Sequence, residues 1–535
     1  MIGIKRRNKM KFRPHSLFAL LIIALLCALL ISCETDIKDG EQTKEAVTTT
    51  VTTAQSPAAT TQSPVTTTTN PPATTTQKSV VTTSVTPATT TQKPAVTEPP
   101  FVTGDHKGYT VPDNHGVIGH GFGVVPGRVV WAWDPECFDW NGTGYWWTAS
   151  NFDLDRVAKM MESSIAALAD KATAKEGWDA IFRDHNSRMR ALEDQGYTKG
   201  EKIAIKVNMN GTGSSGTGIT TSSFTSPAVI RALLLTLVRD VRVEPTDITV
   251  FDGSRIIPGF LIEMCSEGEL AGVRFEWNDA KGKNDVTMDK SVPVVWSESF
   301  AGEESYLPTC LTGATYLINL CTVKGHDLAG VTLTAKNHFG TILNSDREYP
   351  PQAANIHGFV TAHYFHWKEG WTWQQRPMNT YTILTDFLAN REIGGKTVLN
   401  IGEMIATART QGGKVDNKTK FSQYPFNGDW PCSILVSQDP VALDSVGYDF
   451  LHAEPEYATA QEYYKGQRST AQNYIHESAL AYNPPSGTYY KNGFGENVTA
   501  SLGVHEHWNN VKEKKYSRNL GKDEGIELYR ITFDK

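Results

Sequence analysis

The chain of 535 residues lacks several patterns that would assign it to a common class of protein. None of its 7 cysteines forms a CxxC pair, which argues against a thiolate zinc site or an iron–sulfur cluster. Outside a basic N-terminal segment its Lys and Arg residues form no basic patch, and the 51 Lys and Arg residues are outnumbered by 58 Asp and Glu residues. We therefore expect no nucleic-acid partner.

Cysteine is also too scarce to define a disulfide framework. Five cysteines follow residue 33, and in an oxidising compartment one disulfide could form among them, but the odd count leaves the pairing open. They are Cys137, Cys265, Cys310, Cys321 and Cys432.

Only one long apolar run occurs, at residues 17–31, and it is short for a membrane span. Because a basic segment precedes it, the run is typical of a signal-peptide core, with a plain anchor helix as the alternative. Its end, LISC, resembles a bacterial lipobox, which implies cleavage before Cys33 and a lipid on the Cys33 sulfur. We expect residues 1–32 to be a lipoprotein signal peptide and the mature protein to be anchored to the extracytoplasmic face of the cell membrane.

Residues 33–104 lack the apolar side chains that a folded core needs. From about residue 43 the composition is dominated by Thr, Pro, Ala, Val, Ser and Gln, and such a segment cannot offset its ordering entropy by burial. The composition predicts a disordered Thr/Pro-rich stalk, followed by a globular domain over residues 105–535.

The globular part alternates strand patterns with helix patterns, which predicts an α/β fold. We expect a mostly parallel sheet with flanking helices, an aromatic-rich N-terminal extension and an irregular C-terminal region. Strands are predicted at residues 202–208, 247–251, 314–323, 396–401 and 433–437. Helices are predicted at residues 154–169, 178–192, 228–238 and 441–451, the last two opened by Ser226-Pro227 and Asp439-Pro440.

Polar side chains follow nearly every predicted strand. Ligands of open α/β sheets bind outside the carboxyl ends of the strands, so these side chains are candidates for one shared site. They are Lys206, Asn208, Asp252, Ser254, Lys324, His326, Glu403 and Asp439.

Residues 316–340, YLINLCTVKGHDLAGVTLTAKNHFG, are the strongest single candidate for part of that site. An apolar strand pattern ends at Lys324 and His326, and a second Lys/His pair follows at Lys336 and His338. Lys is almost never buried unless it is paired. If residues 330–340 are extended, Thr332, Thr334, Lys336 and His338 share a face; if they are helical, Thr332 and Lys336 still do.

Six motifs occur in order along the chain: IKVNMN, TSPAVIRALL, ITVFDGS, LINLCTVKGH, VTLTAKNHFG and SQDPVALDSVG. Together they resemble the domain of unknown function 362 family, most strongly over residues 203–447. The flanking motifs VVWAWDP and SLGVHEHWNN are similar to a longer bacterial surface subgroup of that family. The resemblance implies an α/β fold with a shared site. Relatives often carry an aspartate after a glycine where this chain has Glu403-Met404, and the cysteine clusters of some members are absent, so no iron–sulfur cluster is expected.

These observations predict a set of site residues. The catalytic candidates are Lys324, His326, Lys336, Asn337 and Asp252. The candidates for substrate binding are Lys206, Asn208, Ser254 and Thr334. A divalent metal would be held by His326, His338 and Asp252. The alternatives are a solvated loop of turn residues at Lys324–His326 and a structural role for His338.

Other candidates carry weaker signals. His363 and His366 have a spacing that suits metal ligands on a helix, with His357 nearby, but the segment is equally an aromatic packing segment. His505 and His507 alternate and are interpreted as structural. Asp444 lies beside apolar positions of its helix and needs a partner, for which a lysine of the IKVNMN motif is a candidate. Residues 211–216 fit GxGxxG but do not lead directly into a helix, so we expect a flexible loop, whose backbone N–H groups could cover a ligand.

Two functions follow from these predictions. The first is an enzyme that acts on a small anionic molecule, such as a carboxylate or a phosphate, because two lysines dominate the central segment. The second is a non-catalytic surface module that binds cell-surface polysaccharide or other envelope components through exposed aromatic side chains of residues 129–147. Burial of those aromatic side chains in the core is the alternative for that segment.

Overall fold

The computed structural model describes residues 115–212, 221–277, 286–298, 304–326, 329–344, 378–454, 457 and 470–533. All of them belong to one compact unit, Val96–Lys535. The predicted signal peptide, the stalk and Cys33 lie outside the described residues, as do His357, His363, His366 and most of the GxGxxG segment. Within the described ranges, no helix has the length and apolar composition needed to cross a membrane.

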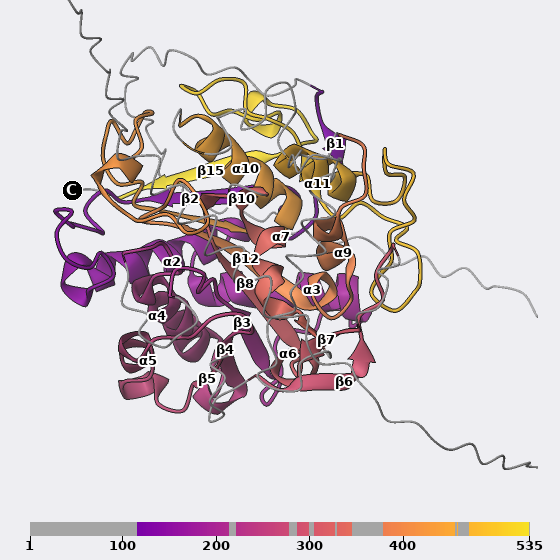
Figure 1. Cartoon of the computed structure of the whole chain (residues 1–535), viewed down its shortest axis with the longest axis horizontal. Coiled ribbons are helices and arrows are strands. Elements are labelled where there is room, and N and C mark those ends of the chain that lie inside the picture. Colours follow the sequence, from indigo (N-terminus) through magenta and orange to yellow (C-terminus); the bar gives the residue numbers. More distant parts are fainter. Residues whose placement is uncertain are drawn as a thin grey trace, which may run out of the picture. The chain divides into compact units, whose positions relative to one another are not determined.

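A sheet of eight strands forms the centre of the described part, in the order β15–β2–β13–β12–β8–β3–β4–β5 (Figure 1). Neighbouring strands are parallel except for β13, which is antiparallel to both β12 and β2. The predicted α/β fold with a mostly parallel sheet is confirmed. The strands are β2 (Arg128–Trp133), β3 (Ile203–Lys206), β4 (Ile248–Asp252), β5 (Arg274–Trp277), β8 (Tyr316–Thr322), β12 (Thr397–Met404), β13 (Ser433–Ser437) and β15 (Glu527–Thr532).

Helices cover both faces of this sheet, and each face has its own hydrophobic core. Alternate side chains of a strand enter different cores: Ile203 and Ile205 of β3 pack with the first helix layer, and Ala204 packs with the second. Figure 1 shows α2, α4 and α5 on one side of the strands and α7, α10 and α11 on the other. The first layer contains α2 (Leu154–Leu168), α3 (Ala174–Arg190), α4 (Pro227–Thr236) and α5 (Gly259–Cys265), and the second contains α7 (Thr334–Asn337), α9 (Ile383–Ala389), α10 (Pro440–His452) and α11 (Thr470–Ala479).

Two helices begin where the sequence predicts them to begin. The Ser226 hydroxyl accepts a hydrogen bond from Val229 N at 3.3 Å at the start of α4, and Asp439 Oδ1 accepts one from Ala442 N at 2.9 Å at the start of α10. In each case a proline occupies the first helical position, where a missing N–H costs nothing.

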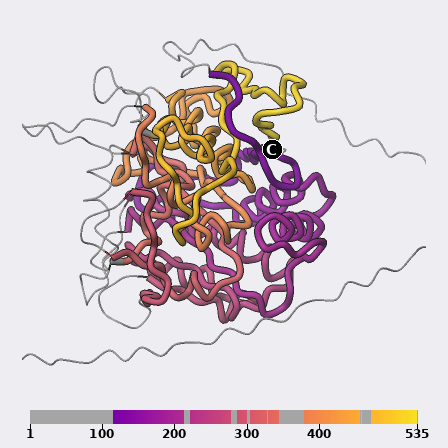
Figure 2. Tube along the Cα trace, turned by 90° about the vertical axis from the view of Figure 1, so that its right-hand side faces the viewer, coloured from indigo at the N-terminus to yellow at the C-terminus, as the bar shows by residue number. Residues whose placement is uncertain are grey.

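Short strands lie outside the central sheet. β1 (Ile118–Gly119) pairs with β14 (Val504–His505), so the first described residues run beside the C-terminal region (Figure 2). β9 (Lys324–His326) pairs with β10 (Gly330–Thr332), and a third small sheet joins β6 (Met288–Pro293), β7 (Ser305–Pro308) and β11 (Leu343–Asn344). The short helix α6 (Thr309–Thr312) follows β7.

Several local predictions differ from the structure. Lys324 and His326 do not lie in a solvated loop, because they form the buried strand β9. Residues 330–340 are neither wholly extended nor wholly helical: β10 ends at Thr332 and α7 begins at Thr334. Because β13 is antiparallel, its carboxyl end, with Asp439 after it, lies at the opposite edge of the sheet from the carboxyl ends of the parallel strands.

The aromatic segment is mostly part of the core. Trp131, Trp140 and Trp146 are at most 4% exposed, because strand β2 lies inside the sheet and the two later tryptophans pack against Trp430 and Phe224. Only Tyr145 of this segment is largely exposed, at 43%, and it stacks on Trp147. The five described cysteines are free thiols.

Candidate functional site

The carboxyl ends of β3 and β4 place a buried ion pair at one edge of the sheet. Lys206 Nζ lies 3.3 Å from Asp252 Oδ2, and neither side chain is more than 2% exposed. The Asp252 carboxylate also accepts hydrogen bonds from Met209 N at 2.9 Å, Ser254 N at 2.8 Å and Ser254 Oγ at 2.7 Å. Burial lowers the pKa of Lys206, and Asp252 acts in the opposite direction by stabilising the ammonium.

Gly340 brings the segment after α7 into contact with this pair. Its carbonyl accepts a hydrogen bond from Gly253 N at 2.7 Å. A methyl group at Gly340 would lie 2.7 Å from Asp252 Oδ1, 2.9 Å from Lys206 Nζ and 3.0 Å from Ser254 Oγ. Three polar side chains therefore converge on one backbone position, and a larger residue there would force them to shift.

A chain of amide side chains connects α7 to the strand ends. Asn208 Nδ2 donates to Asn337 Oδ1 at 3.1 Å, and Asn337 Nδ2 donates to Asn319 Oδ1 at 2.8 Å. Asn319 Nδ2 donates in turn to Thr334 O at 3.0 Å. The predicted Asn208 and Asn337 therefore lie together, and they orient α7 against β3 and β8.

Asp444 of α10 holds the first turn of α7. Its two carboxylate oxygens accept hydrogen bonds from Thr334 N at 2.8 Å and Ala335 N at 3.2 Å, and Tyr474 OH donates to it at 3.0 Å. The predicted lysine partner of Asp444 is therefore wrong, because backbone N–H groups and a tyrosine satisfy this buried carboxylate. The Thr334 hydroxyl donates to Pro440 O at 3.4 Å.

Lys324 and Lys336 are buried close enough to affect each other electrostatically. Lys324 is fully buried and donates to Ser223 O at 2.8 Å, while Lys336 Nζ lies 3.5 Å from the centroid of the Phe339 ring. Burial lowers the pKa of Lys324 to about 7. Burial also lowers the pKa of Lys336 to about 7, and Lys324, Arg255 and Lys206 reinforce this effect by repulsion. Each lysine therefore gains or loses a proton near neutral pH.

Glu403, at the end of β12, is a buried acid beside these cations. Its Oε1 accepts a hydrogen bond from Ile405 N at 3.0 Å, and its Oε2 has no hydrogen-bond partner within the described part of the chain. Burial raises the pKa of Glu403 to about 8, although Lys324 acts to lower it. The side chain is therefore mainly protonated at neutral pH.

The predicted metal ligands do not converge. Ala329 N donates to His326 Nδ1 at 3.1 Å, and His338 Nδ1 lies 3.3 Å from Thr341 Oγ1. Burial lowers the pKa of His338 to about 3, so its ring is neutral. Among the described residues, His326, His338 and Asp252 do not form a group of ligand atoms close enough to share one ion.

Two residues of the strand-end site, Asn319 and Arg255, were not assigned a role from the sequence. Asn319 is a polar residue inside the apolar strand pattern YLINLCT, and that interruption was its only signal. Arg255 follows the DGS turn, and its guanidinium donates to Ser254 O at 2.8 Å. Its charge acts on both Lys324 and Lys336.

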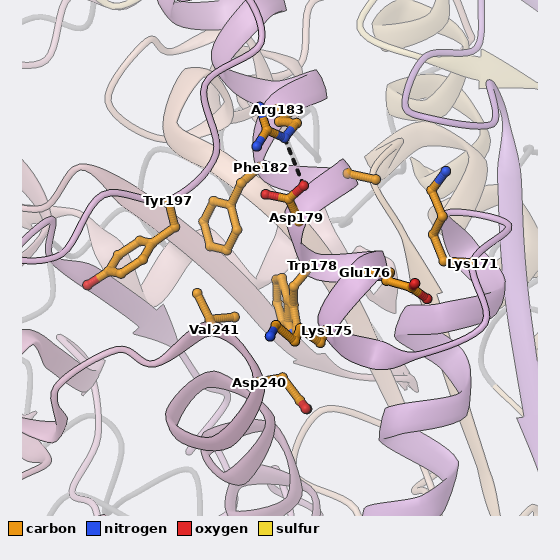
Figure 3. A pocket seen from close by; sticks show the side chains of 11 residues that line it. Lys171, Lys175, Glu176, Trp178, Asp179, Phe182, Arg183, Tyr197, Asp240 and Val241 are labelled. Carbon is orange, nitrogen blue, oxygen red and sulfur yellow. Dashed lines mark hydrogen bonds and ion pairs between the residues drawn. The ribbon is translucent and has the colours of Figure 1, made fainter.

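A pocket of about 560 Å³ in the first helix layer contains none of the predicted site residues. Trp178, Phe182 and Tyr197 form its apolar wall, and the ion pair between Arg183 and Asp179 lies at its side (Figure 3). It is therefore separate from the strand-end residues.

Residues 203–449 match the model of a family described as "Domain of unknown function (DUF362)". This stretch of the chain is therefore similar to the family that its motifs predict, and the match includes β3, β4, β8, β12, β13 and most of α10. No curated protein matches the chain. The function of the domain therefore rests on the chemistry of its own residues.

Proposed function

We propose that the strand-end site binds a small anionic molecule, with a carboxylate or phosphate group held near Lys336 and Lys324. The observation that carries this proposal is the excess of buried lysines. Lys206, Lys324 and Lys336 are each at most 6% exposed, and within the described part of the chain only Lys206 forms an ion pair with a carboxylate. Repulsion among these cations is costly in a low-dielectric site. A bound anion would relieve that cost and raise the lysine pKa values.

The second part of the proposal is that the site is catalytic. Glu403 and Lys324 have pKa values of about 8 and 7, so each can donate and accept a proton near neutral pH. A protonated Glu403 would serve as a general acid, and a neutral Lys324 or Lys336 as a general base or nucleophile. Asp252 and Asn337 would act as positioning groups, because their hydrogen bonds orient the strand ends and α7.

We further propose that this domain is displayed outside the cytoplasm. The support is the lipobox-like LISC sequence before the Thr/Pro-rich segment. Lipid on Cys33 would anchor the protein to the membrane, and the stalk would hold the domain away from it.

The alternative function, a module that binds glycan through aromatic side chains, has less support. A sugar-binding platform needs exposed aromatic faces, and three of the tryptophans in question are buried. The exposed Tyr145 stacks on Trp147, which itself stacks on Phe260, so this short stack is the remaining candidate.

Calorimetric titration with inorganic phosphate and with malonate tests the anion site. We expect the wild-type protein to bind one of these anions at a single site and Lys336→Met to bind it about 10–100-fold more weakly, the worth of one charge-assisted hydrogen bond. Lys159→Met, an exposed lysine of α2, is the matched control and should bind like the wild type. Equal affinities of the Lys336→Met and wild-type proteins, or no binding of either anion, would contradict the proposal.

A further inference from the structure

Three histidines from distant parts of the chain meet away from the strand-end motifs. His115 precedes β1, His476 lies on α11 and His505 lies on β14. One ring nitrogen from each lies within 4.8 Å of the others, and His115 Nε2 is 3.1 Å from His505 Nε2. All three residues lie outside the part of the chain that matches the family model.

Helix α10 orients the ring of His505, as second-shell groups do in metal sites. The Ser445 hydroxyl lies 2.8 Å from His505 Nδ1, which leaves Nε2 directed at His115. Metal-binding histidines almost always use their second ring nitrogen in this way.

A fourth histidine, His507, lies beside the other three. Its ring centroid is 4.8 Å from that of His505 and 5.5 Å from that of His115. The Asp449 carboxylate lies 2.7 Å from His507 Nδ1 and is itself fixed by Trp508 N and Tyr516 OH. His507 Nε2 is buried and has no hydrogen-bond partner among the residues that the structure describes. This is the carboxylate–histidine arrangement that supports metal ligands.

Packing alone gives a poor account of this arrangement. Histidine rings are polar, and gathering four of them in one place costs free energy unless their ring nitrogens are satisfied. Two Nε2 atoms at 3.1 Å either share one proton or both direct lone pairs at a common cation. With two other imidazoles in ring contact with His115, the second explanation accounts for all four side chains.

We propose that His115, His476 and His505 bind a divalent transition-metal ion of the zinc type, with His507 next to its open coordination position. Neutral imidazole suits such ions, and three protein ligands with one open position are typical of catalytic rather than structural zinc sites. The ion would also tie the start of the described chain to α11 and β14. Helix α10 serves both regions, because Asp444 holds α7 while Ser445 and Asp449 hold the histidines.

Metal analysis of the protein, purified without a polyhistidine tag, tests this proposal. After incubation with Zn²⁺ and dialysis, we expect one zinc ion per wild-type chain and loss of most of it in His115→Asn and in His476→Asn. Two variants should keep the metal: His120→Asn, an exposed histidine of the same N-terminal segment, and His338→Asn at the strand-end site. No zinc in the wild type, or loss caused by His338→Asn instead, would overturn the proposal.

Three further measurements test the site and separate ligand loss from misfolding. Far-UV circular dichroism of each metal-free variant should match that of the metal-free wild type. Ser445→Ala keeps all four imidazoles and should weaken zinc binding by about 10–100-fold, the usual effect of removing a second-shell partner. Co²⁺ should give the visible absorption bands of a low-coordinate site in the wild type. Unchanged zinc affinity in Ser445→Ala, or a purely octahedral cobalt spectrum, would count against the proposed site.

Discussion

Asp252→Asn should be among the most destabilising single substitutions at the strand-end site. The substitution removes the negative charge 3.3 Å from Lys206 Nζ, where both side chains are at most 2% exposed. Breaking a buried pair by removing one partner typically costs about 3–5 kcal/mol, because the other charge stays buried without compensation. Burial already lowers the pKa of Lys206, so the lysine will lose its proton more readily and the cost should lie near the lower value, about 3 kcal/mol.

Hydrogen bonding adds to the effect of Asp252→Asn. The two carboxylate oxygens accept from Met209 N, Ser254 N and Ser254 Oγ, in addition to the lysine. An asparagine has one acceptor oxygen and one NH₂ group, so at least one of these buried donors loses its acceptor. Such a loss alone costs about 1–3 kcal/mol.

Urea unfolding of a double-mutant cycle measures the interaction directly. Lys206→Met removes the buried cation, so Asp252→Asn should cost less in the Lys206→Met background than in the wild type. We expect a coupling of about 1–3 kcal/mol between the two positions. Strict additivity, or a cost below about 1 kcal/mol for Asp252→Asn alone, would refute the description of this pair as a buried, mutually compensating unit.

Three other predictions concern neighbouring parts of the structure. Gly340→Ala should destabilise the protein by about 1–3 kcal/mol in thermal unfolding, because the added methyl group would overpack against Asp252, Lys206 and Ser254. An unchanged melting temperature would contradict the close approach of these side chains to Gly340. The free energy of unfolding of the wild type should rise between pH 7 and 10.5 because of Lys336, whose pKa is about 7 in the folded state and 10.5 ordinarily, so that the unfolded state binds more protons. Lys336→Met should flatten this rise in urea unfolding, and equal slopes of the two proteins would contradict the prediction. Asp439→Ala should lower the free energy of unfolding by about 1–2 kcal/mol, because α10 loses its N-cap. It should also weaken zinc binding, since Asp439 Oδ2 accepts a hydrogen bond from Val504 N at 3.0 Å beside His505. Unchanged stability and unchanged zinc affinity would exclude a link between this cap and the histidines.

Local signals were enough to predict the sheet strands that carry the site. The apolar runs before Lys206, Asp252 and Lys324 end where β3, β4 and β8 place polar side chains at one edge. Capping residues likewise marked the starts of α4 and α10, because Ser and Asp side chains satisfy the first free N–H groups of a helix. The contact between Lys206 and Asp252 follows from parallel pairing of neighbouring strands.

Long-range geometry was the part that the sequence did not supply. The antiparallel direction of β13, which moves Asp439 to the other edge, is set by its partners β12 and β2 and has no local signature. His115 and His505 are 390 residues apart, so no spacing rule brings them together. Burial, which shifts the pKa of Glu403 to about 8, is likewise a property of the folded chain.

The buried lysines are proposed to form an anion site. A crystal structure of the wild-type protein soaked with tungstate, an anion that scatters anomalously and resembles phosphate, tests it most directly. We expect an anomalous peak within hydrogen-bonding distance of Lys336 Nζ, and its absence in Lys336→Met crystals. Tungstate bound only elsewhere on the protein, with Lys336 still lying over the Phe339 ring, would contradict it.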